Sequence, residues 1–290
     1  MRTTPSIDEV MAASILQDFA PIAESNANPN GYWGAITSSV DWCEINYHVS
    51  SYLCEFFNSF SSVAMVLVGV LGYFLQHDLL EARFVVAMCM ISVVGMGSFA
   101  FHATLKHETQ MLDEVPMLWN ALSLLYIITE NEHASTPKYG FWFPLSLTMY
   151  GVITSLLVAL TNGLLQFCAF HVSFATLEFY CLYQVYQMNR RYSNENQAMR
   201  TLFNYGFYTF LIALVCWQLD INFCSTLQSL PLGIPNPQFH AWWHILVSVG
   251  LYDLTIFIVY RRQQVLYKKG HLVGAPDVKY VFGLVPYVSL

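Results

Sequence analysis

Long apolar runs follow one another along the chain from about residue 56, and short polar connections separate them. A bilayer core about 30 Å thick needs ~20 mostly apolar residues in each spanning helix. The runs lack the alternation of membrane-barrel strands, and a spanning helix satisfies its backbone hydrogen bonds internally. We therefore predict an all-α integral membrane protein, a bundle of seven transmembrane helices over residues 56–76, 84–104, 111–129, 141–161, 164–187, 201–219 and 239–260.

Composition supports this class. Of the 290 residues 56% are hydrophobic and only 11% are charged, whereas about a quarter of the residues of a soluble domain are charged. The 21 Phe, 18 Tyr and 7 Trp suit aromatic belts at the membrane surfaces. A net charge of −7 argues against nucleic acid as a partner. The first apolar run begins too late for a cleaved signal peptide, so we expect the first span to act as the signal anchor.

The positions of Lys and Arg predict the orientation, because loops rich in these residues stay cytosolic. With the N-terminus outside, the outer side holds only Arg2 and Lys106 of the 12 Lys and Arg residues. We therefore expect the N-terminus outside, or in an organelle lumen, and the C-terminus in the cytosol. The predicted parts are a lumenal segment over 1–55, a seven-helix transmembrane domain over 56–260, which would contain any functional site inside the membrane, and a basic cytosolic tail over 261–290.

Ionisable side chains are costly inside a membrane span, so each one is a functional candidate. The second span contains G-S-F-A-F-H, which places Ser98 and His102 on one helical face near the outer end. The seventh span opens with H-A-W-W-H, which places His240 and His244 four residues apart at the same end. Three spans thus bring polar groups to one depth, because the third span also begins there.

The third span opens with Q-M-L-D-E-V-P, and we expect Asp113, Glu114 and Pro116 in its first turn. Proline suits a first turn, and a carboxylate such as that of Glu114 is favoured by the positive end of a helix. Deeper in the membrane, Glu178 and Asp253 have no partner that the sequence identifies.

Two histidines at i and i+4, with a third from another helix, can hold zinc and leave a fourth position for water. We predict His102, His240 and His244 as the ligands. Zinc lowers the pKa of a bound water to about 7 and polarises a carbonyl. Asp113 would then orient that water or accept its proton, and Ser98 would donate a hydrogen bond to an oxyanion.

Simpler explanations exist for the same residues. The paired histidines could be interfacial residues beside Trp242 and Trp243, and Ser98 could be a small residue that lets helices pack closely. We assign His171, in the fifth span, to helix packing.

An acidic segment, D-W-C-E-I-N-Y at residues 41–47, precedes the first span, and Glu55 follows where that helix begins. Such hard oxygen donors are the ligands that calcium prefers, although the spacing differs from an EF-hand loop. A solvated acidic segment is the alternative. The candidate calcium ligands are Asp41, the backbone carbonyl of Trp42, Glu44, Asn46 and Glu55.

Most of the seven cysteines lie in spans and are expected to be reduced. Cys43 and Cys224 both fall on the predicted outer side, where an oxidising lumen permits a disulfide. Cys54 is a competing partner.

Several motifs, in order and spacing, resemble the alkaline ceramidases, which are seven-helix membrane amidases of the endoplasmic reticulum and Golgi. They are G-Y-W-G at 31–34, D-W-C-E at 41–44, then G-S-F-A-F-H, M-L-D-E and H-A-W-W-H. The resemblance covers nearly the whole chain, apart from the first 30 residues and the P-L-G-I-P-N-P-Q loop. It implies a zinc-dependent hydrolase that cleaves ceramides, phytoceramide or dihydroceramide included, to a sphingoid base and a fatty acid.

The resemblance also implies roles for the residues singled out above, and no obligatory protein partner. Zinc is expected on His102, His240 and His244 beside catalytic Asp113 and Ser98; calcium on Asp41, Trp42, Glu44, Asn46 and Glu55; and a disulfide between Cys43 and Cys224.

Two other classes compete with this interpretation. The progestin and adiponectin receptors resemble the chain in having seven spans, three histidines, a serine and an aspartate. Their N-terminus lies inside, whereas the Lys and Arg positions here predict it outside, and the D-W-C-E motif is associated with the ceramidases. A metal-ion or proton transporter would place its ionisable residues near the bilayer midplane, along a path between the two faces.

Overall fold

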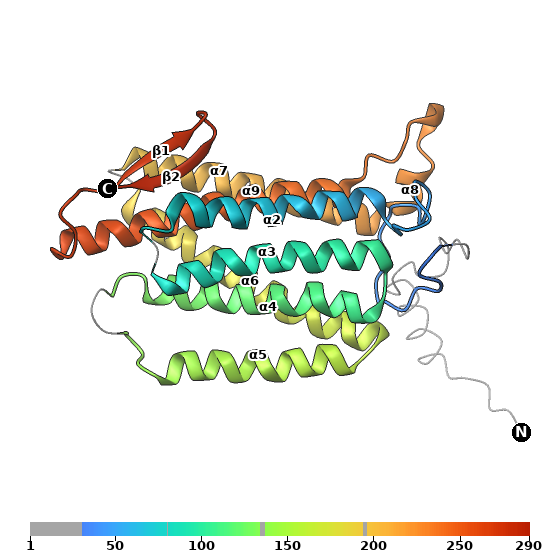
Figure 1. Ribbon diagram of the computed structural model, residues 1–290, viewed down its shortest axis with the longest axis horizontal. Coiled ribbons are helices and arrows are strands. Elements are labelled where there is room, and N and C mark those ends of the chain that lie inside the picture. Colours follow the sequence, from blue (N-terminus) through green and yellow to red (C-terminus); the bar gives the residue numbers. More distant parts are fainter. Residues whose placement is uncertain (1–30, 80, 134–136, 194–195) are drawn as a thin grey trace, which may run out of the picture.

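The computed structural model describes residues 31–79, 81–133, 137–193 and 196–290, so the first 30 residues of the predicted lumenal segment lie outside the description. The described chain forms a bundle of long helices (Figure 1). The long helices are α2 (Phe56–Gln76), α3 (Ala82–Thr104), α4 (His107–Glu130), α5 (Trp142–Leu160), α6 (Gly163–Tyr192), α7 (Gln197–Asn222) and α9 (Phe239–Lys268). The smaller elements are α8 (Cys224–Gln228), a 3₁₀ turn (Pro231–Gly233), β1 (Asp277–Val281) and β2 (Val285–Ser289).

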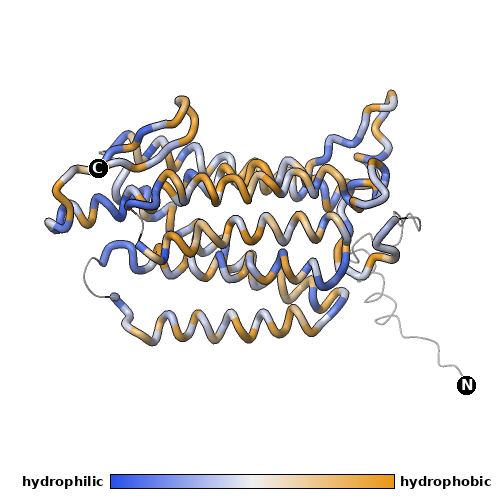
Figure 2. The backbone as a smooth tube through the Cα atoms, in the orientation of Figure 1, coloured by the Kyte–Doolittle hydropathy of each residue, from blue (hydrophilic) through white to orange (hydrophobic). Residues whose placement is uncertain are grey.

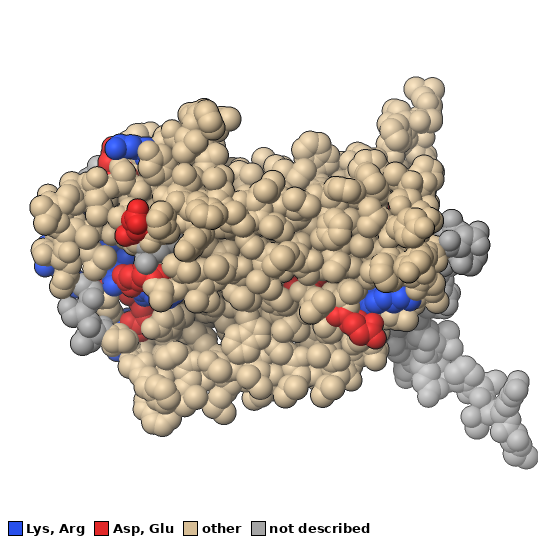
Figure 3. Space-filling view, viewed as in Figure 1, with Lys and Arg blue, Asp and Glu red and all other residues tan. Residues whose placement is uncertain are grey.

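The seven long helices are each long and apolar enough to cross a membrane, which confirms the predicted fold class. Apolar residues dominate the middle of the bundle (Figure 2), and most charged side chains on the face in Figure 3 lie near its two ends. Residues 31–55 lie at one end of the bundle and the C-terminus at the other (Figure 1). We call the end with residues 31–55 the outer end, in keeping with the predicted orientation.

The helices do not pack equally. Helix α9 lies between α2 and α7, and α3 lies between α2 and α4. Helix α5 packs on α4 and α6 at the edge of the bundle (Figure 1). Helices α6 and α7 contact each other only sparsely, and residues of both helices line a cavity in the bundle.

Helix α4 begins earlier than predicted. It starts at His107, so Asp113 lies beyond the first turn and Pro116 is inside the helix. The expectation that these residues occupy the first turn was wrong. The polar residues from His107 to Gln110 are helical as well, and they form the first turn of α4. Helices α6 and α9 also extend past their predicted inner ends, with Arg and Lys in their last turns.

The inner end is held by ion pairs and by the C-terminal hairpin. Arg261 contacts the Glu132 carboxylate at 2.5 Å, and Arg262 contacts that of Glu81 at 2.5 Å. Strands β1 and β2 pair antiparallel, and β2 packs against α9 and α2. The Tyr252 hydroxyl of α9 donates to the Pro286 carbonyl at 2.7 Å.

One close backbone contact sets the position of α4 against α3. Pro116 has no N–H with which to bond the Leu112 carbonyl. That carbonyl faces Gly97 of α3, and a Cβ atom at Gly97 would come within 1.9 Å of its oxygen. A glycine is therefore required where Asp113, the next residue of α4, comes close to Ser98, the next residue of α3.

Replacing Gly97 should therefore separate the two helices. We expect Gly97→Ala to lower the free energy of unfolding by about 3 kcal/mol or more, because the clash is with backbone and cannot be relieved by a rotamer change. Thermal unfolding of the detergent-purified protein measures this. The neighbouring Met96 is 56% exposed on the lipid side, so Met96→Ala is the control, and equal melting temperatures for the two variants would contradict the contact.

Candidate functional site

The three predicted metal-ligating histidines meet at the outer end of the bundle. His102 comes from the last turn of α3, and His240 and His244 from the first turns of α9. Their candidate ligand nitrogens all lie within 4.8 Å of one another. The side chains are only 1%, 3% and 3% exposed. Among the described residues, this is the one group of three His, Cys, Asp or Glu side chains that converges in this way.

Neighbouring side chains orient the imidazole rings. The Nδ1 of His102 lies 2.5 Å from Oε2 of Glu55, and the Nδ1 of His244 lies 2.8 Å from the Ser61 hydroxyl. Each contact leaves the Nε2 atom of that ring for a metal ion, an arrangement common around metal-binding histidines. The His240 ring stacks on Trp42 at 3.7 Å between centroids.

A metal ion fits this donor set. The Nδ1 atom of His240 is buried and has no hydrogen-bond partner among the described residues, and a buried polar atom without a partner is costly. Three convergent imidazoles match the ligand preference of zinc in catalytic sites. The residues present can therefore hold a metal ion.

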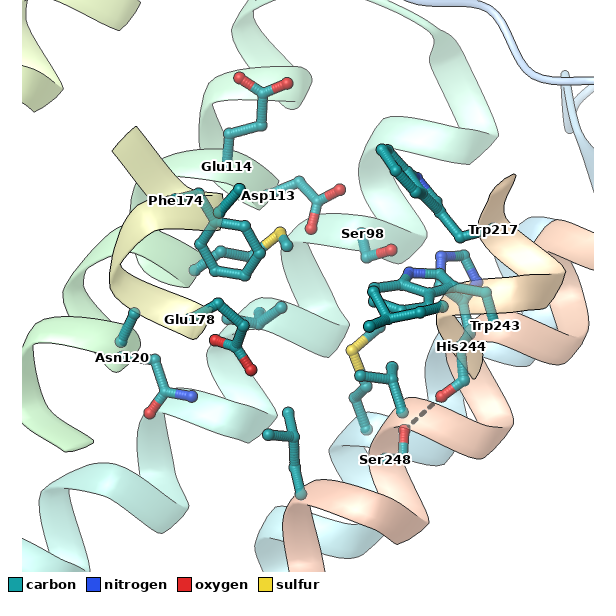
Figure 4. A pocket seen from close by; sticks show the side chains of 18 of the residues that line it. Ser98, Asp113, Glu114, Asn120, Phe174, Glu178, Trp217, Trp243, His244 and Ser248 are labelled. Carbon is teal, nitrogen blue, oxygen red and sulfur yellow. Dashed lines mark hydrogen bonds between the residues drawn. The ribbon is translucent and has the colours of Figure 1, made fainter. Parts of the chain in front are cut away.

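The predicted catalytic residues lie beside this cluster on the wall of a cavity of about 500 Å³. Asp113, Ser98, His240 and His244 all line it. Figure 4 shows Asp113 and Ser98 on neighbouring helices. The Ser98 hydroxyl bonds that of Ser62 at 2.9 Å.

The Asp113 carboxylate accepts no hydrogen bond within the described part of the chain, and it is therefore available to a ligand in the cavity. His171 also lines the cavity, but its Nδ1 bonds the Phe167 carbonyl at 2.8 Å, in keeping with a packing role.

The acidic segment is folded against the histidine cluster. Asp41, Glu44, Asn46 and Glu55 are all at most 4% exposed, which contradicts the alternative of a solvated segment. The Asn46 amide nitrogen donates to both oxygens of Asp41 at 3.1 Å. The Asn46 Oδ1 is buried without a partner among the described residues.

Burial changes the electrostatics of these carboxyls. It raises the pKa of Asp41 and of Glu55 to about 8 and that of Glu44 to about 7, and the nearby Glu55 charge adds to the rise at Asp41 and Glu44. Buried carboxyls that repel one another favour either protonation or a bound cation. Calcium would be one such cation.

The acidic segment also caps the first span. The backbone N–H groups of Phe57 and Asn58 donate to the two carboxylate oxygens of Glu44, at 2.8 and 3.0 Å. These groups belong to the first turn of α2, whose N–H donors have no partner within the helix. Glu44 therefore stabilises α2 whether or not a cation is bound.

A disulfide joins Cys43 to Cys224, as predicted, and Cys54 is a free, buried thiol. It links the acidic segment to α8, which precedes the histidine helix.

The chain matches the family model described as Ceramidase over residues 34–289. It belongs to the ceramidase family. An alkaline ceramidase of Arabidopsis thaliana is 32% identical over 90% of this chain and 96% of its own length. Alkaline ceramidase 3 of Mus musculus is 33% identical, over 89% and 94%. An alkaline ceramidase of Saccharomyces cerevisiae is 30% identical, over 80% and 79%.

The predicted family is thereby confirmed, and with it the prediction that this ceramidase-family chain is an enzyme. The match does not favour the receptor or transporter alternatives.

The sequence did not identify three further residues that connect parts of this ceramidase-family site: Ser61, Ser62 and Asp220. Ser61 and Ser62 of α2 contact His244 and Ser98. The polar run N-S-F-S-S at 58–62, inside an apolar span, is the signal that could have identified them. Asp220 of α7 accepts hydrogen bonds from the backbone N–H of Cys43 at 3.1 Å and of His240 at 3.2 Å. It therefore connects the disulfide to the first turn of the histidine helix.

Removal of the Asp220 carboxylate should loosen this connection. We expect Asp220→Ala to lower the free energy of unfolding by about 2 kcal/mol or more, because two buried N–H donors lose their acceptor. Thermal unfolding with the disulfide intact is the measurement. Asn222→Ala, on the exposed side of the same helix, is the control, and an Asp220→Ala protein as stable as that control would disprove the bridging role.

Proposed function

We propose that the chain is a zinc-dependent ceramidase that hydrolyses the amide bond of ceramides with water. The observation that carries this proposal is the convergence of three buried histidines with Asp113 and Ser98 at one end of an apolar cavity. The zinc ligands would be His102, His240 and His244. A zinc ion held there would supply Lewis-acid chemistry, making a water more acidic and polarising the amide carbonyl.

The protein residues have distinct roles in this reaction. Asp113, whose carboxylate has no protein hydrogen bond, would accept a proton from the attacking water and pass it to the leaving nitrogen. Ser98, whose hydroxyl lies 2.9 Å from that of Ser62 in the free protein, would turn its O–H to donate a hydrogen bond to the carbonyl oxygen as negative charge develops there. The C–N bond breaks, the acyl carbon gains the hydroxyl, and the nitrogen gains the proton. The products are a fatty acid and a sphingoid base.

The lining of the cavity suits a lipid amide. Below the histidines its walls are formed by apolar side chains, including Met65, Val94, Leu124, Phe174 and Leu251. A two-chain lipid could place its amide at the histidine cluster and a chain along these walls, where burial of apolar surface favours binding. Phytoceramide and dihydroceramide share this amide and are candidate substrates with ceramide.

The proposal includes a calcium ion on Asp41, the Trp42 carbonyl, Glu44, Asn46 and Glu55. The buried carboxylates and the unpartnered Asn46 Oδ1 support it. Its role would be to fix the segment that supports His102 through Glu55 and His240 through Trp42. We place the outer end of the bundle in the lumen of the endoplasmic reticulum or Golgi, and the tail from residue 261 in the cytosol.

The zinc mechanism predicts that fatty-acid release from a fluorescent ceramide, at mildly alkaline pH, stops when a zinc chelator is added and returns when zinc is restored. We expect His240→Ala to abolish release, and Asp113→Ala to slow it by about 10²–10⁴-fold, the usual contribution of acid–base catalysis. His77→Ala, at the inner end of α2, is the control. Full release by either site variant, or in the presence of the chelator, would refute the mechanism.

The calcium proposal predicts stabilisation of the wild-type protein by calcium. At a free concentration of about 100 times Kd, the gain is about 2.7 kcal/mol, visible as a higher melting temperature. Glu44→Ala should melt at a lower temperature, lose this calcium response and lose activity in parallel. The exposed Glu108 supplies the control Glu108→Ala, which should keep the response. A wild-type protein that melts at the same temperature with calcium and with a calcium chelator would leave Glu44 with its helix-capping role alone.

A further inference from the structure

The cavity contains a second polar group in its apolar part, away from the histidines. Glu178 of α6 and Asn120 of α4 both line it. Figure 4 shows their side chains on the side of the cavity away from Ser98 and His244. Neither residue has a role in the hydrolysis proposed above.

Helix geometry places this pair well below the reacting amide. Asn120 lies two turns after Asp113 on α4, which puts it on the same face and about 10 Å deeper. Helices α4 and α6 lie against each other at this level, because the Cys181 thiol is 3.7 Å from the Ala121 carbonyl. Glu178 is one turn before Cys181 on the same face of α6.

Both groups lack partners. Within the described residues, nothing donates a hydrogen bond to the Glu178 carboxyl, and the Oδ1 atom of Asn120 is buried without a partner. Asn120 is only 7% exposed. By contrast, Glu114, a buried glutamate that also lines the cavity, accepts hydrogen bonds from Gln110 and Gln166. An ionisable side chain facing a membrane cavity is costly unless a ligand uses it.

We propose that Glu178 and Asn120 form a subsite for a hydroxyl group carried partway along a hydrocarbon chain of the lipid substrate. The inference rests on the proposed amide hydrolysis and names the class of ceramide that the cavity prefers: one whose acyl or sphingoid chain carries a hydroxyl several carbons from the amide.

A hydroxyl is the small group that matches both side chains. It has one donor and two acceptor positions, so it can donate to the Glu178 carboxyl and accept from the Asn120 amide nitrogen, or donate to the Asn120 oxygen if the amide is rotated. An unsubstituted hydrocarbon chain would remove water from the Glu178 carboxyl and the Asn120 amide without forming a hydrogen bond to either. In the proposed reaction the amide lies at the level of Asp113, about two helical turns from Asn120. The hydroxyls next to the amide, and the amine of the product, therefore do not reach Glu178 and Asn120.

The test compares ceramides in which one hydroxyl is moved stepwise along the acyl chain, or along the sphingoid chain, with the unsubstituted ceramide. We expect the wild-type protein to cleave one mid-chain isomer with a kcat/KM roughly tenfold higher than the unsubstituted lipid, the effect of one buried hydrogen bond. If the preferred isomer belongs to the acyl-chain series, the acyl chain occupies the subsite; if it belongs to the sphingoid-chain series, the sphingoid chain does. Equal kcat/KM for all isomers of both series would overturn the proposal.

Two variants separate recognition from folding. Glu178→Leu should remove the preference for the hydroxylated isomer and raise the turnover of the unsubstituted lipid. Glu178→Gln keeps hydrogen-bonding atoms and should retain most of the preference for the hydroxylated isomer. Gln184 of the same helix does not line the cavity, and its amide nitrogen donates to the Tyr180 hydroxyl. Gln184→Leu therefore removes a polar side chain outside the cavity and should leave the preference unchanged. A preference that persists in Glu178→Leu would also overturn the subsite.

A binding measurement keeps this inference distinct from the proposed function. Purified full-length protein with its metal removed is titrated with hydroxylated and unsubstituted fatty acids, and the two Kd values are compared in the wild type and in Glu178→Leu. A roughly tenfold preference that Glu178→Leu abolishes supports the subsite even if no ceramide is hydrolysed. Hydrolysis of ceramides without any such preference in binding or turnover would leave the proposed function intact and reject the subsite.

Discussion

The contacts of one buried carboxylate hold the outer end of this protein together. Glu55 is fully buried, and its Oε2 contacts the Nδ1 of His102 while its Oε1 accepts from the backbone N–H of Trp42 at 3.0 Å. The backbone N–H of Glu55 donates to the carbonyl of His102 at 2.9 Å. That carbonyl is in the last turn of α3, where carbonyls have no partner within the helix. Glu55 thus positions the His102 ring, the end of α3 and the acidic segment at once.

The remaining polar groups at this end follow from the same constraint. A polar atom that is buried near the membrane must find a partner inside the protein. Glu44 provides acceptors for the start of α2, and Asp220 provides one for the start of α9. The serines of α2 connect His244 to Ser98. The outcome is a set of rings and carboxylates that are fixed before any ligand binds, a condition for efficient catalysis.

The sequence predicted the spans and the histidine cluster because both depend on short-range patterns. Apolar run length identifies a spanning helix, and the spacing of His240 and His244 places them on one face. The Glu55–His102 contact and the role of Asp220 could not be predicted in this way, since each joins residues far apart in the chain. The start of α4 was wrong for another reason. Residues 107–110 are polar, and they are helical because Gln110 bonds Glu114, Gln166 and the backbone of Ser39.

The same physical argument separates the two polar regions of the cavity. At the outer end of the described chain, the polar groups without a protein partner include exceptions at sites proposed to hold a ligand: the Nδ1 of His240 and the Asp113 carboxylate beside the cavity, and the Oδ1 of Asn46 in the acidic segment. Deeper in the cavity the walls are apolar, and Glu178 and Asn120 are exceptions of the same kind. A membrane protein can keep an unpartnered carboxyl there only at a cost in stability. A ligand group that bonds both side chains would offset this cost, and the apolar walls around them fit a hydroxyl carried on a hydrocarbon chain, as we propose.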